Sequence, residues 1–262
     1  MLDAACPGYV FSSPTPDQML AAADKVDSGA GVLFIVKNYS GDVMNFEMAA
    51  EMMSGPNASV LTNDDVAVED SSFTTGRRCV AATVVVEKMV GSLAEAGGSL
   101  EQCKKLGDKV NKNSGSMGVA LTSCSVPAAG KPNFEIGDDE MEFGVGIHGE
   151  PGRRRDKIKS AQEITSELLE AINEDLKPEK NEEILLFVNG MGGTPLTELY
   201  LIFDNAKNVL DKKNIKISRS LVGNYCTSLE MQGASITLTK LDEELVKHWD
   251  SSVLTAAMRW GM

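Results

Sequence analysis

The sequence predicts an α/β protein with two domains, in which mixed and parallel sheets are flanked by helices. Short apolar runs of strand length alternate with longer amphipathic segments of helix length, which is typical of sheets covered by helices. The chain has 262 residues and 42% hydrophobic content, enough to bury one large core or two medium ones. Around residues 113–115 the pattern changes and Ser, Gly and Asn gather, so we expect one domain at residues 1–114 and a second at 115–262.

The first half is expected to form a parallel α/β unit. Thr15 and Pro16 open a helix that extends to about Val26, since proline is harmless in a first helical turn. The continuous apolar run at 31–36 is typical of a strand covered on both faces. Asp42 is placed to cap the helix that follows. The remaining elements continue the alternation: a helix at 43–53, a strand at 59–61, and helices at 76–95 and 99–112.

The second half contains more strands and more chain-breaking residues. Pro127, Gly130 and Pro132 interrupt the chain after a first strand-like run. The expected elements are strands at 116–124 and 142–147, a helix at 161–176, a strand at 183–188, a helix at 194–213, strands at 215–222 and 234–241, and a short helix that contains His248.

Charge and composition exclude several classes of function. The chain carries 25 basic and 38 acidic residues, a formal net charge of −13, which disfavours binding to nucleic acid. We expect no membrane-spanning helix, because no apolar run is long enough. The five cysteines include no CxxC pair and the two histidines are far apart, so we expect neither a bound metal nor disulfides. Free thiols fit a protein of the reducing cytoplasm.

The densest glycine cluster surrounds a single histidine at 143–152. Gly144, Gly146 and Gly149 match the dinucleotide-binding pattern GxGxxG, but that pattern requires a helix to begin at its last glycine. A turn and a basic loop that contains Arg153 follow instead, so we reject a nucleotide site here. His148 would then lie at the end of a strand, where glycines allow close approach and a neutral imidazole can act as a nucleophile or base. Spacing alone favours a structural role for this histidine, because no partner is evident in the sequence.

Other polar positions permit both structural and functional interpretations. Lys37 and Asp42 share the loop after the strand at 31–36, and ligands commonly bind at that end of a strand in open α/β sheets. Asp42 could be a helix cap, a general base or both, while Lys37 would by default be a solvated charge. The turn at 189–194 could cradle a phosphate, but a tight turn capped by Thr194 is the simpler reading. The remaining groups have structural interpretations. We expect a solvated or partner-facing loop at Arg153, Arg154 and Arg155. We expect core or interface positions for Met44, Met48, Met52 and Met53.

The chain resembles the substrate-binding subunit of dihydroxyacetone kinases over essentially its whole length. The His148 block is the most specific part of the resemblance. Seven stretches carry it: Gly-Val-Leu-Phe-Ile-Val-Lys-Asn-Tyr-Ser-Gly-Asp-Val-Met-Asn-Phe-Glu (31–47), Asn-Asp-Asp-Val-Ala-Val (63–68), Gly-Arg-Arg-Cys (76–79), Val-Pro-Ala-Ala-Gly-Lys-Pro (126–132), Met-Glu-Phe-Gly-Val-Gly-Ile-His-Gly-Glu-Pro-Gly (141–152), Gly-Thr-Pro-Leu-Thr-Glu-Leu-Tyr (193–200) and Arg-Trp-Gly (259–261).

The resemblance implies a homodimer of two-domain α/β subunits that bind short-chain ketoses or aldoses, chiefly dihydroxyacetone. It implies that His148, in the second domain, adds to the substrate carbonyl to give a covalent hemiaminal. Lys37 and Asp42 would contact the sugar, with Asp42 accepting a hydroxyl proton during phosphoryl transfer. No cofactor would be bound by this chain, since the phosphoryl-donor nucleotide is expected on a partner subunit. A split, phosphoenolpyruvate-dependent system is favoured over a single-chain, ATP-dependent kinase.

One departure from the family pattern leaves alternatives open. The family carries a Gly-Ser-Gly-His-Glu-Pro segment upstream of the stretch that matches the start of this chain, so the first domain is expected to be incomplete at its start. His248 cannot replace the histidine of that segment. A dihydroxyacetone-sensing co-activator of a transcription regulator, without phosphoryl transfer, is therefore an alternative. A lipid-binding protein of the related DegV-like fold is a weaker one, because the His148 block is intact.

Overall fold

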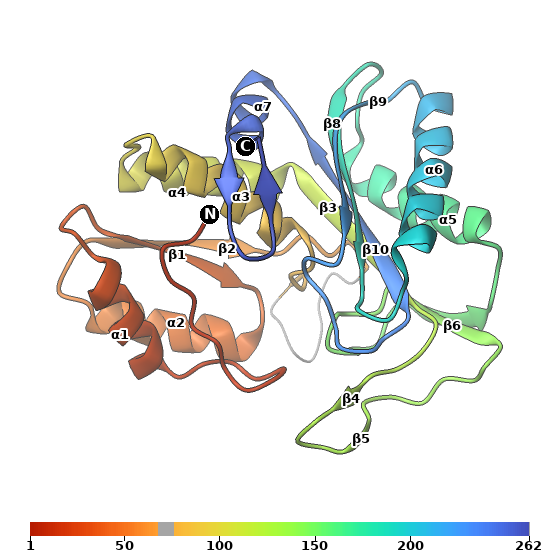
Figure 1. Ribbon diagram of the computed structural model, residues 1–262, viewed down its shortest axis with the longest axis horizontal. Coiled ribbons are helices and arrows are strands. Elements are labelled where there is room, and N and C mark those ends of the chain that lie inside the picture. Colours follow the sequence, from red (N-terminus) through yellow and green to blue (C-terminus); the bar gives the residue numbers. More distant parts are fainter. Residues whose placement is uncertain (68–75, 262) are drawn as a thin grey trace.

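The computed structural model describes residues 1–67 and 76–261, in which two main sheets are flanked by helices (Figure 1) and two further pairs of short strands form separate ribbons. Val68, the last residue of the quoted stretch 63–68, lies outside the described residues. The helices are α1 (Pro16–Val26), α2 (Ser40–Met52), α3 (Ala82–Glu95), α4 (Leu100–Lys112), α5 (Ala161–Leu176), α6 (Leu196–Lys212) and α7 (Glu243–Asp250). The strands are β1 (Val32–Lys37), β2 (Asn57–Thr62), β3 (Ser114–Ala120), β4 (Ser125–Val126), β5 (Lys131–Pro132), β6 (Glu140–Phe143), β7 (Arg154–Lys157), β8 (Glu183–Gly190), β9 (Lys216–Gly223), β10 (Gly233–Lys240), β11 (Val253–Leu254) and β12 (Arg259–Trp260).

The small sheet consists of β1 and β2, paired in parallel with Lys37 opposite Thr62. Alternate side chains point to opposite faces, so Phe34 packs against Phe46 of α2 on one face. On the other face Val60 joins the core formed with α3 and α4. In Figure 1 the strands lie between α1 and α2 below and α3 and α4 above. The parallel α/β unit expected for the first half is therefore present.

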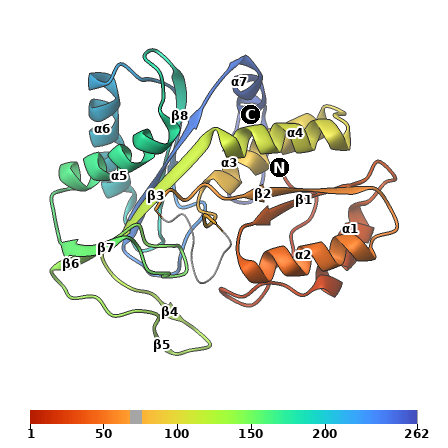
Figure 2. The ribbon, with the colours of Figure 1, turned by 180° about the vertical axis from the view of Figure 1, so that it is seen from behind.

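The large sheet has six strands in the order β7-β6-β3-β10-β8-β9. β10 lies between β3 and β8 and is antiparallel to both, whereas β8 and β9 are parallel, so the sheet is mixed. Along β8, Leu186 faces the core beneath α5 and α6, and the neighbouring Phe187 faces the core shared with α3 and α7. Figure 2 shows α5 and α6 together beside the sheet, away from β1 and β2.

One hydrophobic core spans both halves of the chain. It contains Val60 of β2, Val85 of α3, Phe187 of β8 and Trp249 of α7. The large sheet begins with β3 at Ser114, beside the expected boundary. The division into domains at 1–114 and 115–262 stays a prediction, because the shared core joins the two parts.

The expected helix at 76–95 was too long at its start, since α3 begins at Ala82. The carboxylate of Asp64 accepts hydrogen bonds from the backbone N–H groups of Val80 (2.9 Å) and Ala82 (3.0 Å). Because these groups are bonded to a distant side chain, the residues before Ala82 take an irregular course. Arg78 lies in this irregular segment and not on a helix.

Three smaller expectations were also wrong. Asp42 does not cap α2: it lies in the first helical turn, and Tyr39 is the residue before the helix. Thr194 does not cap α6, since its hydroxyl donates to the carbonyl of Gly233 at 2.7 Å. The strand expected at 142–147 ends at Phe143, where Gly144 turns the chain with a φ of +83°.

The basic residues Arg153–Arg155 are exposed to solvent as expected, but two of them lie on a strand and not in a loop. Arg154 and Arg155 lie on β7, and Arg155 forms an ion pair with Glu142 at 3.1 Å. Arg153 donates to the carbonyl of Ala67 at 2.6 Å. These charges protect the edge of the large sheet.

Of the four methionines in and directly after α2, only one packs in a core. Met44, Met48 and Met52 recur at one-turn spacing and are exposed, whereas Met53 packs beside the small sheet. No helix in the described part of the chain is long and apolar enough to cross a membrane.

Candidate functional site

A cavity of about 1420 Å³ lies between the first residues of the chain, the end of β1 and the loop that carries His148. One end is lined by apolar side chains of α1 and β1, including Met19 and Phe34. The other end is polar and contains Lys37, Asp42 and His148. The structure thus brings together the three residues singled out in the sequence, although His148 lies in the other half of the chain.

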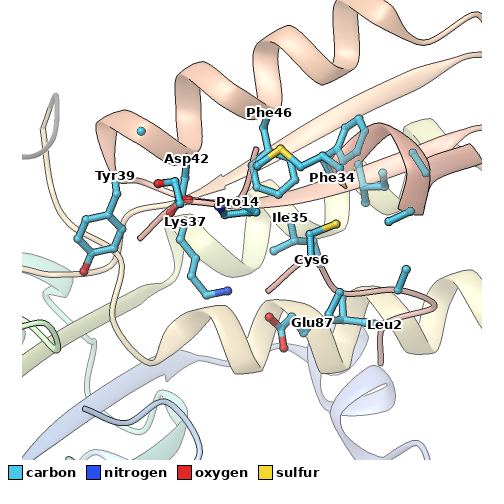
Figure 3. Close-up of a pocket in the computed structure, with 18 of the residues that line it drawn as sticks. Leu2, Cys6, Pro14, Phe34, Ile35, Lys37, Tyr39, Asp42, Phe46 and Glu87 are labelled. Atoms are coloured by element: carbon cyan, nitrogen blue, oxygen red, sulfur yellow. The ribbon is translucent and has the colours of Figure 1, made fainter. Parts of the chain in front are cut away.

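Lys37 and Asp42 reach the cavity from adjoining elements. Lys37 is the last residue of β1, and Asp42 lies in the first turn of α2, where a carboxylate is favoured by the helix dipole. Figure 3 shows the Lys37 side chain extending toward Glu87 of α3. Burial disfavours the ammonium ion, but the neighbouring Cys79 and Glu87 outweigh that effect, and the pKa of Lys37 is raised.

Glu87 is a cavity residue that the sequence interpretation missed. Burial raises the pKa of this carboxyl, while Lys37 and a 3.4 Å hydrogen bond from Thr83 oppose the rise. The available signal was an acidic residue directly after three consecutive valines of a largely buried helix. Such a residue is buried at a cost unless it faces a polar site.

His148 lies in a tight loop whose shape depends on two glycines. The N–H of Gly149 donates to the carbonyl of Gly146 at 3.0 Å. Gly149 has a φ of +84°, and a Cβ atom there would lie 2.0 Å from the Asn133 side chain. A Cβ atom on Gly146 would lie 2.1 Å from the carboxylate of Glu150. The left-handed backbone at Gly149 thus favours glycine, and a side chain at either position would displace Asn133 or Glu150 from its place in the loop.

Glu150 fixes the histidine ring. Its carboxylate lies 2.7 Å from Nδ1 of His148 and accepts the backbone N–H of the same residue at 3.0 Å. Burial alone would raise the pKa of Glu150, but the hydrogen bond and charge of His148 outweigh it, so the pKa is lowered. An ionised carboxylate can only accept, so in the neutral form of the ring Nδ1 carries the proton and Nε2 holds the free lone pair.

Two aromatic rings pack against the imidazole. Phe11 and Tyr39 contact the ring edge-to-face, with centroids 4.7 and 4.8 Å away. The hydroxyl of Tyr39 donates to the carbonyl of Cys79 at 2.9 Å, which anchors that ring. The His148 side chain nevertheless keeps 29% of its surface exposed. A restrained but accessible imidazole is suited to react with a bound molecule.

The other candidate positions have structural roles. Asn189 is fully buried, donates to the carbonyl of Cys226 and accepts from the N–H groups of Tyr225 and Cys226, so the turn at 189–194 is held from within. His248 hydrogen-bonds to Ser92 at 3.0 Å and does not line the cavity.

Fold and site together define an α/β protein with a cavity between its two main sheets and an accessible histidine in the cavity wall. Residues 1–257 match the Dak1 domain, and the chain belongs to this family. The resemblance identified in the sequence is thereby confirmed.

Curated relatives support the same family. The chain is 50% identical to the dihydroxyacetone-binding subunit of PTS-dependent dihydroxyacetone kinase 1 from Listeria innocua, over 93% of this chain and 75% of the relative. It is 44% identical to the dihydroxyacetone-binding subunit of the PEP-dependent dihydroxyacetone kinase of Escherichia coli, over 100% of this chain and 81% of the relative.

Solved structures confirm the two-sheet α/β class. A dihydroxyacetone kinase operon co-activator superposes with a TM-score of 0.86 at 31% identity, over 92% of this chain and 76% of that one. The dihydroxyacetone kinase of C. freundii, in complex with AMP-PNP and Mg²⁺, gives 0.85 at 30% identity over 97% of this chain and 47% of that one. A DegV lipid-binding protein from Thermotoga maritima shares the fold at a TM-score of 0.59 and 12% identity.

Proposed function

We propose that this protein is the dihydroxyacetone-binding subunit of a dihydroxyacetone kinase, and that it holds the ketose covalently on His148. The observation that carries the proposal is the pairing of Nδ1 with Glu150, which leaves Nε2 as the nucleophilic nitrogen in the cavity. The relatives described as dihydroxyacetone-binding subunits support the choice of ligand.

The proposed step adds the whole substrate without loss of water. The lone pair of Nε2 attacks the carbonyl carbon, a C–N bond forms and the carbonyl π electrons move to oxygen. The oxygen takes up one proton, while the ring gives up its Nδ1 proton, for which Glu150 is the adjacent acceptor. The product is a neutral hemiaminal. Glycerol has no carbonyl group, so bond formation selects the ketose more strongly than a pocket could by shape.

We further propose that the bound sugar is then phosphorylated with a donor from another subunit. Asp42 would accept the proton of the reacting hydroxyl, and Lys37 would hold the sugar. The names of the bacterial relatives favour a PTS-dependent kinase made of several subunits. In this proposal a partner subunit carries the phosphoryl-donor nucleotide, and this chain binds no nucleotide or other cofactor. A homodimer remains our expectation, and the free cysteines favour a reducing cytoplasm.

A second candidate is a dihydroxyacetone sensor that acts without transferring phosphate. The likeness to an operon co-activator at a TM-score of 0.86 favours it. A coupled assay with the nucleotide-bearing subunit separates the two: turnover to the sugar phosphate supports the kinase. Sugar binding without turnover supports the sensor.

The test of the binding step is native intact-mass spectrometry with dihydroxyacetone. We expect the mass to increase by one whole substrate in the wild type and not in His148→Ala, because the attacking nitrogen is absent. His248→Ala is the matched control and should keep the adduct, since His248 does not line the cavity. An adduct that persists in His148→Ala would contradict the proposal.

A further inference from the structure

Arg78 and Asp65 form an ion pair that is almost completely buried. Each side chain is 1% exposed, and Nε and Nη2 of Arg78 both lie 2.7 Å from Oδ2 of Asp65. Burial raises the pKa of Asp65 to about 6, even though Arg78 opposes the rise. A buried ion pair is seldom a source of stability by itself, because removing both charges from water is costly. The presence of the Arg78–Asp65 pair therefore needs an explanation other than stability.

The remaining donors of Arg78 serve the loop that carries His148. Nη2 donates to the carbonyl of Gly144 at 2.7 Å, and Nη1 donates to that of Pro151 at 3.1 Å and that of Glu150 at 3.4 Å. The first of these carbonyls lies before the histidine and the other two lie after it. One planar guanidinium thus ties both ends of the loop, which a single ammonium group could not do.

Arg78 also acts on the group that orients the imidazole. Its positive charge helps to keep the pKa of Glu150 low, after the larger contribution of His148. A Cβ atom on Gly146 would lie 3.1 Å from Nη1, so guanidinium, glycine and carboxylate are in close contact. Little room remains for the loop to shift.

The residues next to the ion pair also contact the part of the site that contains Lys37. Asp65 follows β2, and its N–H donates to the carbonyl of Arg78 at 3.0 Å. The neighbouring carbonyl of Arg77 accepts the side chain of Asn38 at 2.7 Å, directly after Lys37. The segment around Arg78 therefore contacts the elements that carry both Lys37 and His148.

We infer that Arg78 is a positioning residue, which sets the His148 loop at a fixed place relative to Lys37 and holds the Glu150 carboxylate against Nδ1 of the imidazole. This inference rests on the proposed function, because it assigns Arg78 a part in carbonyl binding. Asp65 holds the guanidinium in the required orientation.

The first test compares Arg78→Lys with Arg219→Lys. Lysine keeps the charge opposite Asp65 but cannot reach the carbonyls of Gly144 and Pro151 together. Arg219 also pairs with an aspartate, Asp250, but on the surface and with 31% of its side chain exposed. We expect Arg78→Lys to weaken the dihydroxyacetone adduct at least tenfold, and Arg219→Lys to leave it unchanged.

The second readout needs no substrate. With ¹⁵N-labelled histidine, the ring nitrogens of His148 report the tautomer, and His248→Ala assigns the two sets of signals. We expect the Nδ1–H signal of His148 to weaken or exchange faster in Arg78→Lys and to persist in Arg219→Lys. A substitution that only lowered stability would leave the tautomer of the folded protein unchanged.

The adduct measurement and the ring signals test the proposed function and the role of Arg78 separately. If the wild type forms no adduct, the proposed function fails, yet the ring signals still test the positioning role. If Arg78→Lys does not fold, the double variant Arg78→Met with Asp65→Asn removes both charges and is tested in the same way. Ring signals and affinity equal to the wild type in either folded variant would overturn the inference.

Discussion

At the scale of single residues, the contact between Glu150 and His148 controls the chemistry of the ring. The carboxylate is 7% exposed and has a lowered pKa, so it remains ionised at neutral pH and accepts the Nδ1 proton. A neutral amide would accept the same hydrogen bond more weakly and would be a poor acceptor for the proton released during addition. The effect of the charge of Glu150 on the adduct can therefore be separated from the effect of its shape by a substitution that keeps the shape.

We predict that Glu150→Gln keeps the fold and weakens the dihydroxyacetone adduct about tenfold, or about 1.4 kcal/mol. Mass titration of the wild type and the variant measures the affinities. Glu150→Asp is the matched control, since it keeps the charge but shortens the reach. An affinity equal to the wild type in Glu150→Gln would show that the charge is unimportant.

The same carboxyl predicts a dependence of stability on pH. Because its pKa in the folded state lies below the ordinary 4.5, its stabilisation is present above pH 4.5 and is lost as the pH falls through the lower folded value. The free energy of unfolding of the wild type should exceed that of Glu150→Gln at neutral pH. The difference should shrink below about pH 4. A difference that is constant with pH would contradict this assignment.

At the scale of elements, the loop around His148 requires glycine for two separate reasons. Gly149 combines a left-handed backbone with a 2.0 Å approach to Asn133, whose side-chain amide also donates to the carbonyl of His148. Gly29 has a similar φ of +94° but no atom within 4 Å of the corresponding Cβ position. Substitution by alanine therefore introduces backbone strain alone at Gly29, but backbone strain together with a steric conflict at Gly149.

We predict that Gly29→Ala costs about 1 kcal/mol through backbone strain alone, while Gly149→Ala costs about 2–3 kcal/mol and also weakens the adduct. Urea unfolding measures the first effect and mass titration the second. Equal losses of stability with unchanged binding in both variants would mean that the Asn133 contact does not shape the loop.

Most elements could be predicted from the sequence because their signals are local. Helix α5 begins where Ser160 and Glu163 form a capping box, and its observed bounds are those expected. The start of α3 could not be predicted, because Asp64 binds its backbone from a different strand end. Thr194 was misassigned for a similar reason, since its partner Gly233 is distant in sequence.

The same distinction applies to the candidate site. Lys37 and Asp42 adjoin one strand end, so sequence reasoning could place them at a ligand crevice. Glu87 and Arg78 could not be assigned, because their environment is created by tertiary packing. The pairing of His148 with Glu150 spans only two residues, but it depends on a left-handed glycine that spacing does not reveal. The roles of Lys37, Asp42 and His148 in binding remain predictions.

At the scale of the whole molecule, the shared core predicts that the two sheets unfold together. Val60 of the small sheet and Phe187 of the large sheet belong to one buried cluster around α3. We expect hydrogen exchange, followed by mass spectrometry in increasing urea, to give the same midpoint for β2 and β8. A distinctly lower midpoint for β2 would instead show two independent domains, divided near residue 114.

The position of β10 at the centre of the large sheet has a consequence for synthesis of the protein. This strand follows both of its neighbours, β3 and β8, in the sequence and is therefore made after them. While the chain emerges from the ribosome, those two strands have no partner between them and their edges stay open to other chains. The large sheet can therefore close only once β10 has been made, and we expect β3 and β8 to be exposed to wrong pairing until then.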